Sequence, residues 1–220
     1  MFVGTETIFV VIASIVAITL HECSHGYVAN YFGDPTAKEQ GRLTLNPLAH
    51  IDPFGTVILP LLLKLVGMPA FGFAKPVPVN VSRLRDTRNH SFLVSIAGPA
   101  TNIFLALFAV GICRITGVTI SDLNELSYGT WTEVAYFFAI FGLINVSLAI
   151  FNMLPIPPLD GSALIERVVP RRHLPRYFAL RERALPIVLI LFLVNSFTLH
   201  IGSGLYNWAF DLFERLAFPN

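Results

Sequence analysis

Two histidines and a glutamate form a cluster in the first apolar stretch of the chain. His21, Glu22 and His25 make the pattern H-E-x-x-H. On a helix, residues four apart lie on one face, so both imidazoles can bind one Zn²⁺. Glu22 lies beside that face, where a carboxylate can act as general base on a water molecule. The pattern therefore predicts a catalytic zinc site.

The position of this cluster predicts that the site lies within a membrane. Between Thr7 and Phe32, Glu22 is the only Asp, Glu, Lys or Arg. On a helix, the distance from Thr7 to His21 is a rise of about 21 Å, in a hydrocarbon layer roughly 30 Å thick. Ionisable groups at such depth are costly, which makes them candidates for function. A chance motif of surface polarity would leave that cost unexplained.

The chain has the composition of a membrane protein. It has 220 residues, of which 54% are hydrophobic and 13% charged, and its net charge of +1 predicts no general attraction to nucleic acid. Four long segments carry no charged residue, or Glu22 alone: residues 7–32, 92–113, 134–154 and 184–210. Each is long enough to cross a bilayer as a helix, and the last exceeds one untilted span.

Basic residues indicate the orientation in the membrane. Seven Lys and Arg residues lie between the first and second segments, one between the second and third, six between the third and fourth, and one after the fourth. The positive-inside rule places the two basic connections in the cytoplasm and the N-terminus outside. Residues 55–74 must then cross an even number of times, so we expect a re-entrant or interfacial element there. Its flanks, Gly41–Leu45 and Lys75–Val81, are expected as short edge strands.

A third zinc ligand is expected at the end of the third segment. In this topology the first and third segments run in the same direction, so Asp160 arrives on the same side as the two histidines. A catalytic zinc needs three protein ligands and an open position, and Asp160 is the candidate for the third. The alternative is that Asp160 binds no metal and is simply a turn residue before Gly161. The rival ligands, which spacing alone does not exclude, are His50, Asp52 and Glu166.

Two asparagines lie in apolar segments, Asn102 in the second and Asn152 in the third. Hydrogen bonding between helices is one interpretation. Oxyanion stabilisation or binding of a substrate strand is the other. The residues alone favour neither.

These motifs resemble the site-2 protease family of intramembrane zinc metalloproteases. The resemblance rests first on His21–His25 and Asn152–Gly161, which read HECSH and NMLPIPPLDG. Three more stretches, Asn46–Gly55, Ala74–Asn80 and Ala97–Asn102, are similar to the short prokaryotic members. The resemblance covers residues 8 to 165.

The resemblance implies a role for each motif residue. In that family two histidines and the aspartate of the second motif bind zinc, and the glutamate activates water. It implies these roles for His21, His25, Asp160 and Glu22. The family's three-helix core matches the first three long segments. We expect the short type without a PDZ insertion or a C-terminal nucleotide-sensing module, so substrate gating by those parts is absent or supplied by other proteins.

The expectation is therefore an all-α, polytopic membrane protein with a three-helix catalytic core, a re-entrant or interfacial element and short β-strands. It is one domain, residues 1–220, with a core at about 7–165 and a C-terminal helical segment at 184–217. The expected function is hydrolysis of a peptide bond in or near a transmembrane segment, with one Zn²⁺ per chain. The expected location is the cell membrane, with the site toward the cytoplasm.

The expected partners are a transmembrane protein substrate and the lipid bilayer, with no nucleic acid. A homo-oligomer or an accessory regulatory protein stays open. Two other functions compete with proteolysis. A zinc transporter would need polar groups along a path across the bilayer and often an internal repeat. A non-catalytic homologue would be expected to have lost Glu22 or a ligand.

Overall fold

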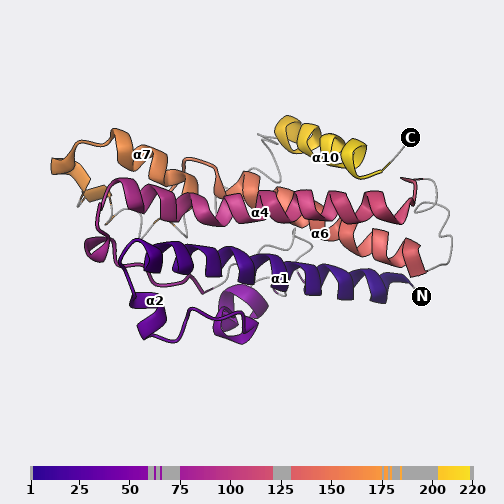
Figure 1. The fold of residues 1–220 in the computed structure, drawn as a ribbon, viewed down its shortest axis with the longest axis horizontal. Coiled ribbons are helices and arrows are strands. Elements are labelled where there is room, and N and C mark those ends of the chain that lie inside the picture. The colour runs from indigo at the N-terminus through magenta and orange to yellow at the C-terminus, as the bar shows by residue number, and fades with distance from the viewer. Residues whose placement is uncertain are drawn as a thin grey trace. The chain divides into compact units, whose positions relative to one another are not determined.

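Three long helices dominate the computed structural model (Figure 1), which describes residues 2–58, 62, 65, 75–120, 130–174, 176, 177, 179, 184 and 203–218. They are α1 (Phe2–Tyr31), α4 (Asn89–Thr116) and α6 (Thr130–Asn152). All three are long and apolar enough to cross a membrane. They coincide with the first three predicted spans, and the helical class is confirmed.

The remaining elements are short. They are α2 (Thr36–Glu39), η1 (Pro47–Ala49), the π-helical η2 (Pro53–Ile58), η3 (Val81–Arg83), η4 (Asp160–Ser162), α7 (Ala163–Val168), η5 (Arg171–His173) and α10 (Ser203–Ala217). Of the predicted re-entrant element at 55–74, only residues 55–58, 62 and 65 are described, so that prediction lies mostly outside the described residues. Most of the fourth predicted span also lies outside them.

The chain forms two compact units, and α1 and α4 each contribute to both. The first unit comprises residues 1–17, 99–152 and 201–220, and the second comprises residues 18–98 and 153–200.

Small side chains and aromatic rings fill the core of the first unit. Ala13, Ala109 and Ala135 are fully buried there, one each from α1, α4 and α6. A β-carbon at Gly142 would lie 2.2 Å from the ring of Phe213, so the glycine lets α10 pack directly on α6. Membrane helices usually pack by close approach through small residues. Lipid tails are as apolar as the side chains, so helix association depends on van der Waals packing and not on the hydrophobic effect.

The second unit is organised around the end of α1. Gly33, with φ of +107°, ends the helix in the left-handed conformation that favours glycine. The next residue, Asp34, has no exposed surface, and its carboxylate accepts hydrogen bonds from the main-chain N–H groups of Thr36 (3.0 Å) and Asn80 (2.6 Å). Asp34 therefore ties the end of α1 to the distant segment before η3.

The predicted edge strands are absent: described residues 41–45 and 75–81 contain no strand. In the second of these segments, three main-chain N–H groups that a strand partner could use are already engaged. Those of Lys75, Val77 and Asn80 donate to the His50 carbonyl, the Glu22 carboxylate and the Asp34 carboxylate. Pro76 and Pro78 carry no N–H. The alternating sequence suggested a strand, but two carboxylates and one loop carbonyl accept hydrogen bonds from these main-chain N–H groups instead.

The start of α4 is capped outside the apolar stretch. The Asp86 carboxylate accepts from the main-chain N–H of Asn89 (3.0 Å) and from its side-chain amide (2.6 Å). These hydrogen bonds lower the pKa of Asp86. The cap satisfies N–H groups that the first turn of a helix leaves without partners.

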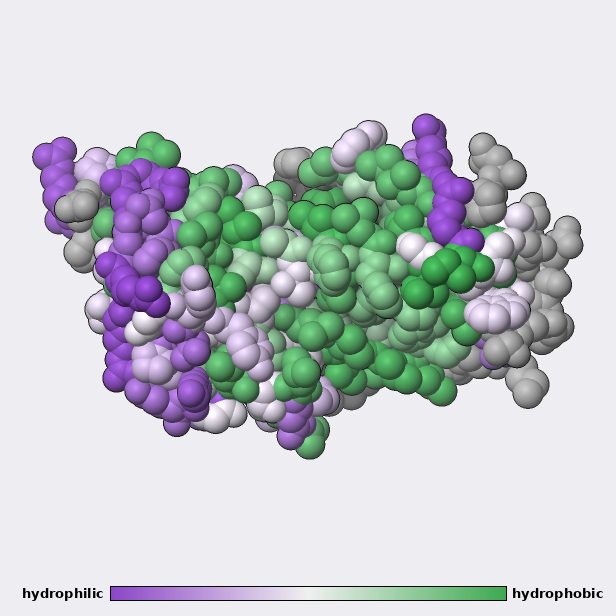
Figure 2. All heavy atoms as spheres, viewed as in Figure 1, coloured by the Kyte–Doolittle hydropathy of each residue, from purple (hydrophilic) through white to green (hydrophobic). Residues whose placement is uncertain are grey.

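The visible surface separates by hydropathy. Figure 2 shows hydrophobic side chains gathered over the long helices and hydrophilic ones over α2 and α7. On α4 the exposed large apolar side chains include Ile103, Phe104, Leu107 and Phe108. Exposed apolar surface on this scale suits a helix that faces lipid.

Candidate metal centre

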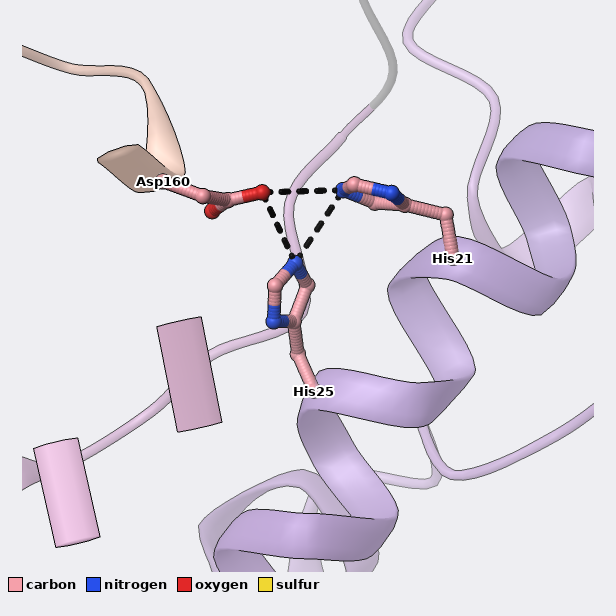
Figure 3. Close-up of side chains that lie close together, drawn as sticks. All are labelled: His21, His25 and Asp160. Carbon is pink, nitrogen blue, oxygen red and sulfur yellow. Dashed lines mark hydrogen bonds and ion pairs between the residues drawn. The ribbon is translucent and has the colours of Figure 1, made fainter. Parts of the chain in front are cut away.

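Three side chains of the second unit converge on one point (Figure 3): His21 and His25 from α1, and Asp160 from η4. Nε2 of His21 and Nε2 of His25 lie 3.1 Å apart. Oδ2 of Asp160 lies 3.2 Å from Nε2 of His21 and 3.3 Å from Nε2 of His25. Ligands at about 2.0–2.1 Å from a tetrahedral metal would be about 3.3 Å apart. The spacing of these three atoms therefore fits one metal ion.

The protonation of His25 also fits a metal ligand. Its Nδ1 lies 2.7 Å from the carbonyl oxygen of Val94, on α4. A carbonyl only accepts, so Nδ1 carries a proton, and Nε2 is the ring nitrogen that faces the site and would bind a metal through its lone pair. Hydrogen bonds of this kind orient a histidine ligand and set its tautomer.

Asp160 supplies the negative charge of the site. Its carboxylate is mostly buried, with 17% of the side chain exposed. Its Oδ2 is buried and has no hydrogen-bond partner, and it points at the two imidazole nitrogens. Burying these acceptors together is costly unless a cation lies between them.

A glycine on α4 leaves space for the site. A β-carbon at Gly98 would lie 2.4 Å from Nε2 of His25 and 2.6 Å from Nε2 of His21. Any larger residue would therefore fill the space in which the two ligand atoms meet. The sequence indicated close packing at Gly98 but did not indicate against what.

A tight turn places Asp160. A β-carbon at Gly161 would lie 2.2 Å from the carbonyl oxygen of Met153 and 2.6 Å from that of Leu154, so the chain folds back on the end of the third span. After the turn, the Arg167 guanidinium lies 4.1 Å from the centre of the Phe92 ring. This cation–π contact attaches α7 to the first turn of α4.

The rival ligands lie elsewhere in the second unit. His50 is buried, and its Nε2 lies 2.9 Å from the Thr44 carbonyl. The carboxylate of Asp52 accepts from the N–H of Gly55 (2.7 Å). Glu166 lies 3.5 Å from the Ser91 hydroxyl. Among the described residues, Asp160 alone joins the two histidines in a possible metal site of three ligands.

Glu22 is fixed by a group that the sequence did not indicate. Its Oε2 accepts a hydrogen bond from the main-chain N–H of Val77 at 2.9 Å. Sequence reasoning also missed the Val94 carbonyl. Every residue except proline carries the same N–H and C=O, so no side-chain type marks which of them will be used.

The two asparagines belong to the first unit. Asn102 is fully buried, and its side-chain amide donates to Oδ1 of Asn145 on α6 at 2.8 Å. Asn152 donates to the Leu148 carbonyl, one turn earlier, at 3.0 Å. The first bond links two helices, and the second lies within one helix. A role for either residue in substrate binding stays a prediction.

Known proteins similar to this chain are peptidases and putative zinc metalloproteases. Residues 8–194 match "Peptidase family M50". The chain is 44% identical over 162 residues to "Putative zinc metalloprotease YwhC" of Bacillus subtilis, covering 74% of this chain and 69% of that protein. It is 31% identical to "Putative zinc metalloprotease Rip2" of Mycolicibacterium smegmatis, over 72% of this chain and 56% of that protein.

An archaeal relative extends the comparison. "Putative zinc metalloprotease MJ0611" of Methanocaldococcus jannaschii is 33% identical over 73% of this chain and 72% of its own length. No solved structure shows a significant match. The family match and the three apolar helices indicate a multi-pass membrane protein. The chain belongs to peptidase family M50, the site-2 protease family of zinc metalloproteases.

Proposed function

We propose that this protein is an intramembrane zinc metalloprotease that hydrolyses a peptide bond in or near a transmembrane segment of another membrane protein. The observation that carries the proposal is the convergence of one ligand atom each from His21, His25 and Asp160, all within 4.8 Å of one another. Glu22 lies next to His21 on the same apolar helix. Proteolysis explains why such costly groups are retained in a membrane-spanning segment.

Each residue has a distinct role. His21, His25 and Asp160 would hold the metal, and three is the number of protein ligands that a catalytic zinc takes. A bound zinc ion supplies Lewis-acid polarisation of the scissile carbonyl and makes a water molecule more acidic. Glu22 accepts the proton of that water as the water oxygen bonds to the scissile carbonyl carbon, and it later delivers the proton to the leaving amine. The protonated amine then departs from the carbonyl carbon.

The substrate must change its conformation to be cleaved. In a transmembrane helix the carbonyl groups are hydrogen-bonded within the helix, so the scissile bond is covered. Local unwinding is needed before attack. We place the N-terminus outside, the site toward the cytoplasmic side and the supply of water on that side. The seven-to-one and six-to-one excess of basic residues in alternate connections supports this orientation.

The decisive experiment compares zinc content with cleavage. The purified protein, reconstituted in nanodiscs with a single-span transmembrane substrate, should cleave that substrate and lose activity on zinc chelation. Glu22→Gln should keep its zinc but lose about 10²- to 10⁴-fold in rate, because an amide cannot take the proton.

Glu39→Gln is the matched control, because it removes an exposed carboxylate that pairs with Arg83 and should leave the rate unchanged. Full activity of Glu22→Gln would contradict the assignment of the base. Zinc-independent cleavage would contradict the metalloprotease itself.

A further inference from the structure

The segment Lys75–Asn80 is anchored to the second unit at both ends. At its start, the N–H of Lys75 donates to the His50 carbonyl at 2.9 Å. At its end, the N–H of Asn80 donates at 2.6 Å to Asp34, whose side chain has no exposed surface. The path of the segment is thus fixed by bonds that do not involve the metal centre.

Between these anchors, Val77 is seated on α1 next to Glu22. Its N–H donates to Oε2 of Glu22 at 2.9 Å. Val77 as a whole is 7% exposed. A β-carbon at Gly26 would lie 3.0 Å from Cγ1 of Val77, so Gly26 permits this close approach. Gly26 follows Glu22 by one helical turn, and both therefore lie on the same face of α1.

The sequence of the segment makes Val77 a single donor. It reads Pro76-Val77-Pro78, so no N–H other than that of Val77 is available between residues 76 and 78. A residue that precedes proline is restricted to extended conformations, which limits the motion of this N–H. Arg42 further restrains the segment by donating to the Lys75 carbonyl at 2.9 Å.

We propose that the main-chain N–H of Val77 is a positioning group for Glu22, which holds the carboxylate where it can take the proton of the attacking water. The proposal rests on the proposed function, in which Glu22 is the general base. A carboxylate has two oxygens, so a bond at Oε2 is compatible with proton uptake at Oε1. Without the bond, Glu22 would be spread over several rotamers and in place for only part of the time.

Two variants remove the donor. Val77→Pro deletes the N–H at a position that the following proline already restricts to extended conformations. Replacement of Val77 by its α-hydroxy acid, in cell-free synthesis, turns the amide into an ester and keeps the side chain. Val77→Ala is the reference for the proline variant, because it trims the side chain and keeps the N–H.

Kinetic constants distinguish a positioning role of the Val77 N–H from a general loss of folding or metal binding. Relative to Val77→Ala, Val77→Pro should lose about 10- to 100-fold in kcat, with KM within about twofold and zinc content unchanged. The ester should lose a similar factor relative to the wild type. A donor-free variant with unchanged kcat would overturn the proposal. An increase in kcat would overturn it as well, because the bond would then restrain the enzyme rather than serve it.

A spectroscopic measurement tests the bond without activity. In protein labelled with ¹⁵N-valine, the Val77 amide is the resonance that disappears in Val77→Ala. Its proton should move upfield in Glu22→Ala, because a hydrogen bond to a carboxylate is lost, and stay in place in Glu39→Ala. An amide insensitive to Glu22→Ala would overturn the inference. If the wild type cleaves no substrate, the proposed function fails, while this shift still decides whether Val77 holds Glu22.

Discussion

Gly98 on α4 faces His25 on α1 so closely that a β-carbon on the glycine would lie 2.4 Å from Nε2 of the imidazole. A non-bonded carbon and nitrogen do not tolerate that separation, and the atom that would have to move is the nitrogen expected to bind zinc. Gly98→Ala should therefore lose zinc through displacement of the histidines, and the overpacking should also lower the free energy of unfolding by about 1–3 kcal/mol.

Zinc content per chain measures the effect of Gly98→Ala. Gly111→Ala is the matched control, because it makes the same change in the same helix at a position where the added carbon would meet no atom within 4 Å beyond the neighbouring backbone of that helix. Gly111→Ala should keep its zinc. Stoichiometric zinc in Gly98→Ala would show that α4 does not lie against the metal centre as described.

Asp160 is expected to be the third zinc ligand, and its loss should break the chelate. Asp160→Ala should copurify with little zinc and be inactive, because two histidines alone hold the ion weakly. His50→Ala should keep its zinc, since His50 Nε2 bonds to the Thr44 carbonyl instead. Metal analysis of both variants checks this. Near-full zinc in Asp160→Ala together with loss in His50→Ala would reverse the assignment.

The orientation in the membrane is tested by single cysteines at Thr5 and Ser82. We expect a membrane-impermeant thiol reagent on intact cells to label the first position and not the second. The native cysteines, Cys23 and Cys113, are 2% and 0% exposed and should react little. If both added cysteines were labelled from the same side, residues 55–74 would cross the membrane an odd number of times.

The bond between Asn102 and Asn145 should stabilise the first unit. Asn102→Ala leaves the buried Asn145 side chain without this donor, and we expect a loss of about 0.6–2 kcal/mol in unfolding free energy. A double-mutant cycle with Asn145→Ala, followed by thermal unfolding, isolates the pair. If Asn102 instead acts on the substrate, Asn102→Ala will lower kcat without lowering stability.

Much of the fold and of the candidate site could be predicted from the sequence, because the information is local. A helical repeat alone puts His21 and His25 on one face. Long uncharged segments predict spans because a helix satisfies its own backbone in lipid. Asp160 could be named as a candidate, but His50, Asp52 and Glu166 remained, since nothing local states which distant loop meets α1.

Only the tertiary structure decided how the main chain and the glycines are used. Lys75–Val81 looked like an edge strand, yet three of its N–H groups donate to Glu22, Asp34 and the His50 carbonyl. Main-chain groups are alike at almost every residue, so their partners follow from packing and not from residue type. The same holds for Gly98. The sequence shows a residue without a side chain, but only the tertiary structure shows which atoms occupy the space that a side chain would fill.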